Sequence, residues 1–366
     1  MLSKAAIADG KGNFKIDSVE VGAPADGEVL VSIKAAGICH TDFASLSWKR
    51  PLVMGHEGAG VVVKVGRAVS SLKKGDQVVF NWAIPCGICF QCKLGNAVLC
   101  EISRPAYVME RSAAHAHPKG TLWNGHPIDR SFNIGTLSEF TLVREEALSL
   151  LPPGVPMTSA AVVSCGVMTG FGSVRNVARV KKGESVVVVG CGGVGLNIIQ
   201  GAVLAKAGKI IAIDVHESSL QRAAMFGASH CLKAQKSAAA RASLVADVMA
   251  LTSGRGADYA FEATGIPDLA FLPLQLIRNG GQAFQVSGIN AQVNVPMPQF
   301  MWNKTYMTPL YGGCVPKRDF PLIFNHYLKR RLLLDELVTR TYRLEELGLA
   351  FQDMLSGKNA KGVVVF

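Results

Sequence analysis

The sequence predicts an α/β protein that combines a doubly wound parallel sheet with a mainly antiparallel, barrel-like domain. Three observations support this fold class. The first third of the chain is rich in short β-like runs, the region from about residue 181 alternates strand-like and helix-like runs, and a glycine-rich turn joins one such strand to a helix. The chain has 366 residues, which is enough for two domains of roughly 100–200 residues each.

The strands of the first third are predicted at residues 29–34, 60–65 and 77–81, and the turn Lys74-Gly75-Asp76 precedes the last of them. A compact lobe of cysteines follows, from Cys86 to Cys100. Residues 101–137 are interpreted as an irregular loop or hairpin. Its histidines, His115, His117 and His126, are interpreted as exposed loop residues rather than as a site.

The alternating region begins with a continuous apolar strand at residues 185–190 and a helix at 195–207. The pattern continues with a strand at 209–214, a helix at 216–226 and strands at 259–262, 282–286 and 293–295. Strands that alternate with helices indicate a parallel sheet covered on both faces. The tail, residues 319–366, is expected to hold two helical segments and a terminal strand at 362–366.

Composition and charge favour a globular protein without a membrane or nucleic-acid partner. Hydrophobic residues make up 49% of the chain and charged residues 18%. The net charge is +11, but the basic residues are scattered, which indicates a solvated surface that also suits an anionic dinucleotide. Residues 1–16 lack the apolar core of a signal peptide, and the apolar stretch 186–205 contains Gly, Asn and Gln residues that suit a membrane helix poorly. A cytoplasmic location is expected.

A dinucleotide site is predicted at Gly190-Cys191-Gly192-Gly193-Val194-Gly195, between a strand and a helix. Glycines there allow a tight turn and a close approach of the backbone to a pyrophosphate, which the helix N-terminus stabilises. Asp214 ends the next strand, where its carboxylate can bind ribose hydroxyls and repel a 2′-phosphate. The next residues, Val215-His216-Glu217, include no Arg or Lys, so NAD is favoured over NADP. The alternative is a structural turn without a ligand.

The chain has nine cysteines, which are interpreted as metal ligands or free thiols rather than disulfides. Cys86, Cys89, Cys92 and Cys100 lie within 15 residues. Soft ligands without a histidine suit a closed, tetrahedral, structural Zn²⁺ site, with an iron–sulfur cluster as the alternative. Cys39, His56 and Cys165 are dispersed, and their spacing alone does not join them, because a single Cys or His is more often a packed or satisfied core residue.

The motifs together resemble those of the zinc-containing medium-chain alcohol dehydrogenases, closest to the class III and bacterial aryl-alcohol branches. The motifs are Cys39-His40-Thr41-Asp42, Gly55-His56-Glu57, the Cys86 to Cys100 lobe, Cys165-Gly166 with Thr169-Gly170, Gly190 to Gly195, and Tyr311-Gly312-Gly313. The resemblance implies a GroES-like catalytic domain from residues 1–166 and 310–366, with a Rossmann NAD-binding domain at 167–309. It also implies two Zn²⁺ per chain and a homodimer or homotetramer.

The resemblance also implies roles for individual residues. Cys39, His56 and Cys165 correspond to the ligands of a catalytic zinc, which acts as a Lewis acid on an alcohol or aldehyde. Thr41 corresponds to the hydroxyl that contacts the substrate oxygen, Asp42 to the carboxylate that orients His56, and Glu57 to the glutamate behind the metal. Thr169 and Val194 fall beside the nicotinamide and His40 and Lys361 at the pyrophosphate, although a purely structural role stays open for these four. The sequence departs at Ala44, where many relatives carry a relay histidine.

The substrate is expected to be a primary alcohol with an aromatic or longer aliphatic group. Trp82, Phe132, Ile134, Ile289 and Leu310 are candidate pocket residues, although each could equally belong to the core. A formaldehyde–thiol adduct is the first alternative. It is weakened by the short, basic segment Ser47-Trp48-Lys49-Arg50, where class III enzymes carry acidic residues, while Arg104 lies near that branch's cofactor-binding arginine.

The sequence disfavours two further classes of protein. A medium-chain reductase of activated C=C bonds is disfavoured because Thr41 and Glu57 are both present. A non-enzymatic zinc protein that binds nucleic acid is disfavoured by the set Cys39, His56 and Cys165. A subunit contact is conceivable along residues 286–295.

Overall fold

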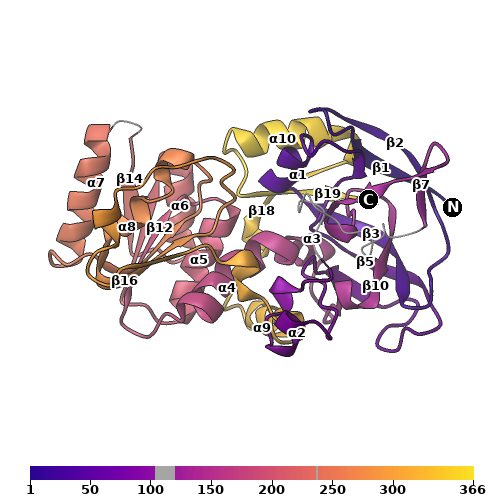
Figure 1. Cartoon of the computed structure of the whole chain (residues 1–366), viewed down its shortest axis with the longest axis horizontal. Helices are drawn as coiled ribbons and strands as arrows, with labels where there is room; N and C mark the ends of the chain where they lie inside the picture. The colour runs from indigo at the N-terminus through magenta and orange to yellow at the C-terminus, as the bar shows by residue number, and fades with distance from the viewer. Residues whose placement is uncertain (104–119, 236–237) are drawn as a thin grey trace. The chain divides into compact units, whose positions relative to one another are not determined.

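The computed structural model describes residues 1–103, 120–235 and 238–366. Arg104, His115 and His117, named above, lie outside the described residues. The chain divides into two compact units, Met1–Cys165 with Val315–Phe366, and Gly166–Cys314 (Figure 1).

The first unit is built around strand β3 (Glu28–Gly37), which pairs antiparallel with β5 (Ala59–Val65), β10 (Phe140–Arg144) and β19 (Lys361–Val365). Strands β10 and β19 pair with successive parts of β3, and the sheet curls into a nearly closed barrel. Its order is β11-β6-β5-β3-β19-β18, and a second sheet runs β8-β7-β2-β1-β4-β9. The other strands are β1 (Leu2–Ala8), β2 (Phe14–Val21), β4 (Leu52–Val53), β6 (Gln77–Phe80), β7 (Thr121–Trp123), β8 (His126–Pro127), β9 (Asp129–Arg130), β11 (Leu148–Leu150) and β18 (Val338–Tyr342).

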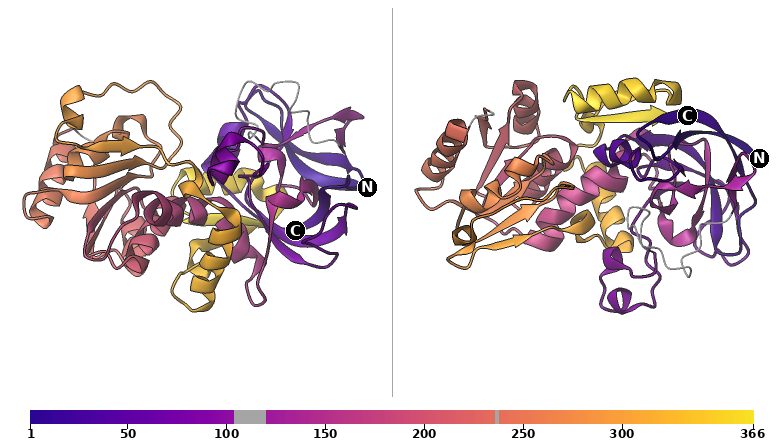
Figure 2. Two further views of the ribbon diagram at one scale, coloured as in Figure 1. Left: turned by 60° about the horizontal axis from the view of Figure 1, so that its bottom comes forward. Right: turned by 45° about the horizontal axis from the view of Figure 1, so that its top comes forward.

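The alternating apolar residues of β3 explain its central place, because Val29, Val31 and Ile33 are fully buried. The helices of this unit are α1 (His40–Ser45), α2 (Phe90–Lys93), α3 (Met157–Val162), α9 (Pro316–Leu328) and α10 (Leu347–Leu355). Strand β19 enters the same sheet from the far end of the sequence, beside β3 (Figures 1 and 2).

The second unit is a parallel sheet in the order β14-β13-β12-β15-β16-β17. Its strands are β12 (Ser185–Val189), β13 (Lys209–Asp214), β14 (His230–Lys233), β15 (Ala257–Glu262), β16 (Ile277–Gln285) and β17 (Thr305–Met307). Helices α4 (Met168–Gly172), α5 (Gly193–Leu204), α6 (Glu217–Met225), α7 (Ala238–Leu251) and α8 (Leu272–Leu276) accompany it (Figure 1). Val187, Ile211 and Ala260 are fully buried at its core. The predicted fold class is confirmed.

Some predicted elements were wrong in detail. Residues 293–295 form no strand, because Pro296 follows them and Val295 instead packs as a loop residue against the core. The strand next to β16 is β17, which sequence analysis missed together with β14 and α7. The helix predicted at 195–207 begins earlier, at Gly193, because the glycine-rich turn already supplies its first residues.

Within the described residues, one helix, Met157–Ala178, is long and apolar enough to cross a membrane. This is weak evidence for a span, because 83% of its most apolar window is buried, as in a core helix. The apolar stretch 186–205, noted above, is divided between β12 and α5 and does not form a single helix.

Candidate active site

Four side chains from separate parts of the first unit converge at one point. Cys39 precedes helix α1, His56 and Glu57 follow β4, and Cys165 lies on the π-helical turn Val163–Val167. One potential ligand atom from each of these residues lies within 4.8 Å of the others. A π-helical turn in a helix commonly marks a functional site, since the extra residue re-aims a side chain. The geometry could hold a metal ion.

Asp42 orients two of these residues. Its Oδ1 lies 2.7 Å from His56 Nδ1, and its Oδ2 accepts a 3.0 Å hydrogen bond from the backbone N–H of Cys39. Asp42 is fully buried, so both contacts are shielded from water. Within the described part of the chain, His56 Nε2 and Glu57 Oε2 are buried without a hydrogen-bond partner. A buried polar atom without a hydrogen-bond partner destabilises the fold, and a bound cation would provide a partner for both atoms.

Among these side chains, the electrostatics favour the deprotonated, metal-binding form of Cys39 alone. The hydrogen bond from the Cys165 thiol lowers the pKa of Cys39 well below its ordinary value, with a further contribution from His56. The same hydrogen bond, together with burial, raises the pKa of Cys165. Burial lowers the pKa of His56, but the negative charges of Asp42 and Cys39 outweigh it and raise the pKa well above its ordinary value. A thiolate is the form that binds metals.

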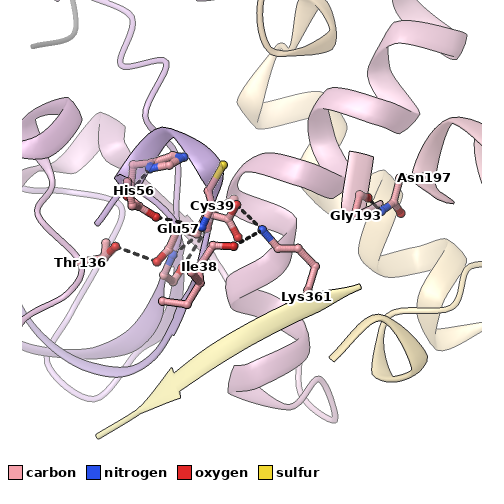
Figure 3. A network of polar contacts seen from close by, with 11 residues as sticks. Ile38, Cys39, His56, Glu57, Thr136, Gly193, Asn197 and Lys361 are labelled. Carbon is pink, nitrogen blue, oxygen red and sulfur yellow. Dashed lines mark hydrogen bonds and ion pairs between the residues drawn. The ribbon is translucent and has the colours of Figure 1, made fainter. Parts of the chain in front are cut away.

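Glu57 is held from three sides. Its Oε1 lies 2.6 Å from Lys361 Nζ, which also donates a 3.0 Å hydrogen bond to the carbonyl of Ile38 (Figure 3). Thr136 Oγ1 donates to the Glu57 carbonyl at 2.7 Å, and a side chain at Gly37 would overlap the carboxylate. Burial raises the pKa of Glu57 to about 7, against the opposing charge of Lys361. Lys361 is thus engaged with Glu57, a contact that sequence analysis missed.

An aromatic cluster lies against the ring of His56. The Phe132 ring centroid is 4.7 Å from that of His56 and 5.1 Å from that of Trp82, and Trp48 lies 5.9 Å from Phe132. Phe132 has a left-handed backbone, with a φ of 52°, which is rare for an aromatic residue. Trp48 was not among the predicted pocket residues. It could have been noticed as the one aromatic residue of the segment 47–50.

The remaining predicted pocket residues do not all join this cluster. Ile134 is fully buried in the first unit, where its carbonyl accepts a hydrogen bond from Thr141. Ile289 and Leu310 are half-buried residues of the second unit. On α1, Thr41 is half-buried, whereas His40 and Ala44 are exposed.

The cysteine lobe forms a second group with the geometry of a metal site. The potential ligand atoms of Cys86, Cys89, Cys92 and Cys100 all lie within 4.8 Å of one another. Backbone N–H groups point at the sulfurs, as from Cys89 to Cys86 Sγ at 3.3 Å and from Ser103 to Cys100 Sγ at 3.4 Å. Burial raises the pKa of Cys100, but hydrogen bonds from the backbone N–H groups of Ser103, Cys86 and Ile102 outweigh it and lower the pKa to about 6. None of the residues of α2 is buried, so the lobe has little apolar core of its own.

The glycine-rich turn of the second unit has the shape of a phosphate cradle. Gly190 has a φ of 93°, and a side chain on Gly195 would overlap the Gly190 carbonyl. A Cβ on Gly192 would meet no protein atom within 4 Å, so that side of the turn is open to a ligand. Val194 is half-buried and Thr169 is 8% exposed.

Asp214 and Asn197 fix the surroundings of the turn. Asp214 Oδ2 accepts a 2.8 Å hydrogen bond from the Cys191 N–H, and Oδ1 accepts one of 2.9 Å from His216 N–H. The Asn197 side chain donates to the Gly193 carbonyl at 2.6 Å, in the first turn of α5 (Figure 3).

Comparison with known proteins defines the class. Residues 25–153 match the family model "Alcohol dehydrogenase GroES-like domain", and residues 193–326 match "Zinc-binding dehydrogenase". The chain therefore belongs to the zinc-containing medium-chain alcohol dehydrogenases, and the resemblance inferred from its motifs is confirmed. It is a zinc alcohol dehydrogenase, an oxidoreductase of a family that generally uses NAD.

Individual relatives of known sequence or structure are similar to this chain over its whole length. The chain is 34% identical to the S-(hydroxymethyl)glutathione dehydrogenase of Escherichia coli O1:K1 and 33% identical to that of Synechocystis sp., over 100% of each chain. Among solved structures, the benzyl alcohol dehydrogenase of Acinetobacter calcoaceticus has a TM-score of 0.90 at 27% identity, covering 100% of this chain and 99% of that one. An alcohol dehydrogenase zinc-binding domain protein from Burkholderia ambifaria has the same score at 29% identity, with the same coverage.

Proposed function

We propose that this chain interconverts a hydrophobic primary alcohol and its aldehyde with NAD, at a zinc ion held by Cys39, His56 and Cys165. The observation that carries the proposal is the convergence of these three ligands, with His56 Nε2 buried and unpartnered. When bound, zinc supplies a Lewis acid and NAD supplies the hydride acceptor.

The residues around the ligands have distinct tasks in this proposal. Asp42 holds His56 through Nδ1, which leaves Nε2 free for the metal. Thr41 would accept a hydrogen bond from the substrate hydroxyl and pass its own proton on as the substrate proton arrives. Glu57 would lie close to the ligand set, with its charge offset by Lys361 at 2.6 Å. His40 would contact the pyrophosphate, and Lys361 would contribute there only by leaving Glu57.

Beyond Thr41, the proton would pass to the ribose hydroxyls of the coenzyme and to water, because residue 44, where many relatives carry the relay histidine, is an exposed alanine. We expect Ala44→His to introduce a new ionisation into the pH profile of alcohol oxidation, near the ordinary histidine pKa of about 6.5. The measurement is kcat as a function of pH for the wild type and the variant. An unchanged profile would contradict a relay through this position.

In the same proposal, residues 1–166 and 310–366 form the catalytic domain and residues 167–309 bind the coenzyme. The turn Gly190 to Gly195 would receive the pyrophosphate, with Gly192 presenting the open side. Asp214 would bind the adenosine ribose, and Thr169 and Val194 would lie beside the nicotinamide. A second, structural zinc would be held by Cys86, Cys89, Cys92 and Cys100.

The substrate class is inferred from the aromatic cluster at His56. Trp48, Trp82 and Phe132 present apolar rings beside the ligand set, which favours an aromatic or longer aliphatic alcohol. Arg50 forms a 3.5 Å ion pair with the buried Asp129, so one of the two cations of segment 47–50 already has a carboxylate partner. Ile134, Ile289 and Leu310 remain candidate pocket residues.

A formaldehyde–thiol adduct is the second candidate substrate, because relatives at 34% identity are named S-(hydroxymethyl)glutathione dehydrogenase. Purified protein should be assayed with benzyl alcohol, longer aliphatic alcohols and S-(hydroxymethyl)glutathione, following NADH absorbance with zinc measured on the same sample. The proposal predicts a higher kcat/KM for benzyl alcohol than for the adduct. Product analysis with cinnamaldehyde and NADH would separate alcohol formation from C=C reduction. A fully zinc-loaded protein that reduces NAD with none of these substrates would contradict the proposal.

We propose a homodimer or homotetramer that pairs along β17. This edge strand and the segment before it expose large apolar side chains, with Met297 72%, Trp302 69% and Met307 52% exposed. Light scattering would give the mass in solution, and a monomer would contradict the proposal. None of the nine cysteines, all of which lie in the described residues, forms a disulfide, which supports a reducing, cytoplasmic location as part of the proposal. The scattered basic residues favour a surface without a nucleic-acid partner.

A further inference from the structure

A buried carboxylate lies at the carboxyl end of β15, outside every motif considered above. Glu262 is the last residue of this strand, and its exposed fraction is 0%. Its Oε1 accepts hydrogen bonds from Thr264 N–H at 2.5 Å, Thr264 Oγ1 at 2.5 Å and Gly265 N–H at 2.9 Å. Its Oε2 accepts a hydrogen bond from Ser287 Oγ. All of these partners donate, so they stabilise a carboxylate.

The donors belong to two loops that leave neighbouring strands. Thr264 and Gly265 follow β15, and Ser287 follows β16, which pairs with β15. The Val286 N–H also donates to the Glu262 carbonyl at 2.8 Å. Glu262 therefore fastens the loops after β15 and β16 to each other, at the edge of the sheet where the parallel strands end.

The glycine-rich turn packs against the first of these loops. A Cβ built on Gly190 would lie 2.7 Å from Thr264 Cγ2 and 3.0 Å from the Ala263 carbonyl carbon. The Ala263 N–H donates to the Val189 carbonyl at 2.8 Å. The Thr264 loop and Gly190 are in direct contact, so a shift of this loop would displace the glycine-rich turn. In doubly wound sheets, ligands bind outside this edge of the strands.

Burying a carboxylate is costly, and no lysine or arginine forms an ion pair with Glu262 among the described residues. An apolar side chain of similar size would stabilise a core at lower cost. Glu262 instead accepts hydrogen bonds from the two loops, the first of which packs against the glycine-rich turn.

We propose that Glu262 is a positioning residue for the coenzyme, which holds the loops after β15 and β16 in the arrangement that receives a nicotinamide dinucleotide. The proposal rests on the coenzyme site proposed above. Glu262 acts through Thr264, Gly265 and Ser287, and is not itself a catalytic residue.

The test uses zinc-loaded full-length protein and the variant Glu262→Gln, which keeps the shape but replaces one acceptor oxygen with an NH₂ donor. Titration with NADH, followed by its fluorescence, should give a Kd raised roughly tenfold, as expected for loss of charge-assisted hydrogen bonds. In coenzyme-free protein, the Thr264 and Gly265 amides should exchange hydrogen faster. Zinc content should stay at the wild-type value.

Asp258→Asn is the matched control. Asp258 lies near the other end of β15 and joins β12 to it, accepting 2.7 Å hydrogen bonds from Ser185 N–H and Ser185 Oγ. Its loss should lower the melting temperature without changing the Kd for NADH. If Glu262→Gln behaves in the same way, Glu262 is only structural and the proposal is overturned.

Thr264→Val and Ser287→Ala each remove one donor and decide the question if Glu262→Gln does not fold. Each should raise the Kd for NADH several-fold, and an unchanged Kd in both would overturn the proposal. A wild-type protein that does not bind NADH would instead refute the coenzyme site itself, and the role of Glu262 with it.

Discussion

The two cysteine groups of the first unit show two ways of assembling a metal-type site. The lobe draws Cys86, Cys89, Cys92 and Cys100 from one short segment, and three of these residues are only half-buried. The other group draws Cys39, His56 and Cys165 from three separate segments, and the buried Asp42 contacts the first two of these residues. The first group offers only sulfur, which suits a closed structural site, and the second offers a mixed set of sulfur and imidazole, which is typical of catalytic sites. The comparison predicts that the lobe contributes to stability and the dispersed set to catalysis.

The largest effect should follow from removing a dispersed ligand. Cys165→Ser should lower kcat/KM by well over 100-fold, since loss of a residue that merely orients a ligand already costs about 10- to 100-fold. Zinc content should fall by one ion per chain while the lobe keeps its own. Metal analysis and steady-state kinetics check both statements, and an active Cys165→Ser enzyme would contradict the assignment.

Asp42→Asn should have a smaller effect at the same site. The amide keeps the shape but weakens the hold on His56 Nδ1 and on the Cys39 N–H. We expect kcat/KM or zinc affinity to fall about 10- to 100-fold. Competition with a chelator measures the affinity, and wild-type values for both quantities would argue against an orienting role.

Cys100→Ser should sharpen the contrast, because it should affect stability more than chemistry. The lobe has no buried residue in α2 to hold it without metal. We expect one zinc per chain to be lost and the melting temperature to fall by about 4 °C or more. The kcat per folded, singly metallated chain should stay near the wild-type value. A large loss of kcat at unchanged stability would reverse the roles of the two groups.

The smallest effect concerns a carboxylate that belongs to neither group. Asp353 accepts a 2.9 Å hydrogen bond from Tyr342 Oη and forms a 2.7 Å ion pair with Arg340. The Tyr342 hydrogen bond is the main cause of its lowered pKa. Because the folded pKa is below the unfolded one, the stabilisation is present above the unfolded pKa of about 4 and is lost as the pH falls through the folded pKa.

Asp353→Asn should therefore lower the melting temperature at pH 7, and the difference from wild type should shrink below about pH 4. Thermal unfolding across this pH range checks the expectation. Zinc content and kcat at pH 7 serve as controls and should not change. A difference that grows towards acid pH would contradict the sign.

Local patterns were predicted well from the sequence. The turn Gly190 to Gly195 lies between β12 and α5, and Asp214 ends β13, because strand, turn and helix are neighbours along the chain. The strand predicted at residues 293–295 was wrong. Its alternating valines are typical of a strand, but a strand forms only where a neighbouring strand is available for hydrogen bonding. The edge position went to Thr305–Met307 instead.

Contacts between distant residues could not be derived from spacing. The group at Cys39 and Cys165 came from family resemblance, and the stacking of Trp48 and Phe132 beside His56 needs the folded chain. The hydrogen bonds of Glu262 could not be predicted either. Nothing in the run Phe261-Glu262-Ala263-Thr264 indicates that its carboxylate accepts hydrogen bonds from two loops.

The ion pair between Lys361 and Glu57 has a consequence for biosynthesis. Lys361 Nζ also binds the Ile38 carbonyl, across a separation of 323 residues. While the ribosome has yet to add β19, the nascent chain carries Glu57 without its counter-charge and β3 without one of its neighbours. The surroundings of Cys39 can therefore be completed only after Lys361 has been translated, however early the surrounding barrel begins to form.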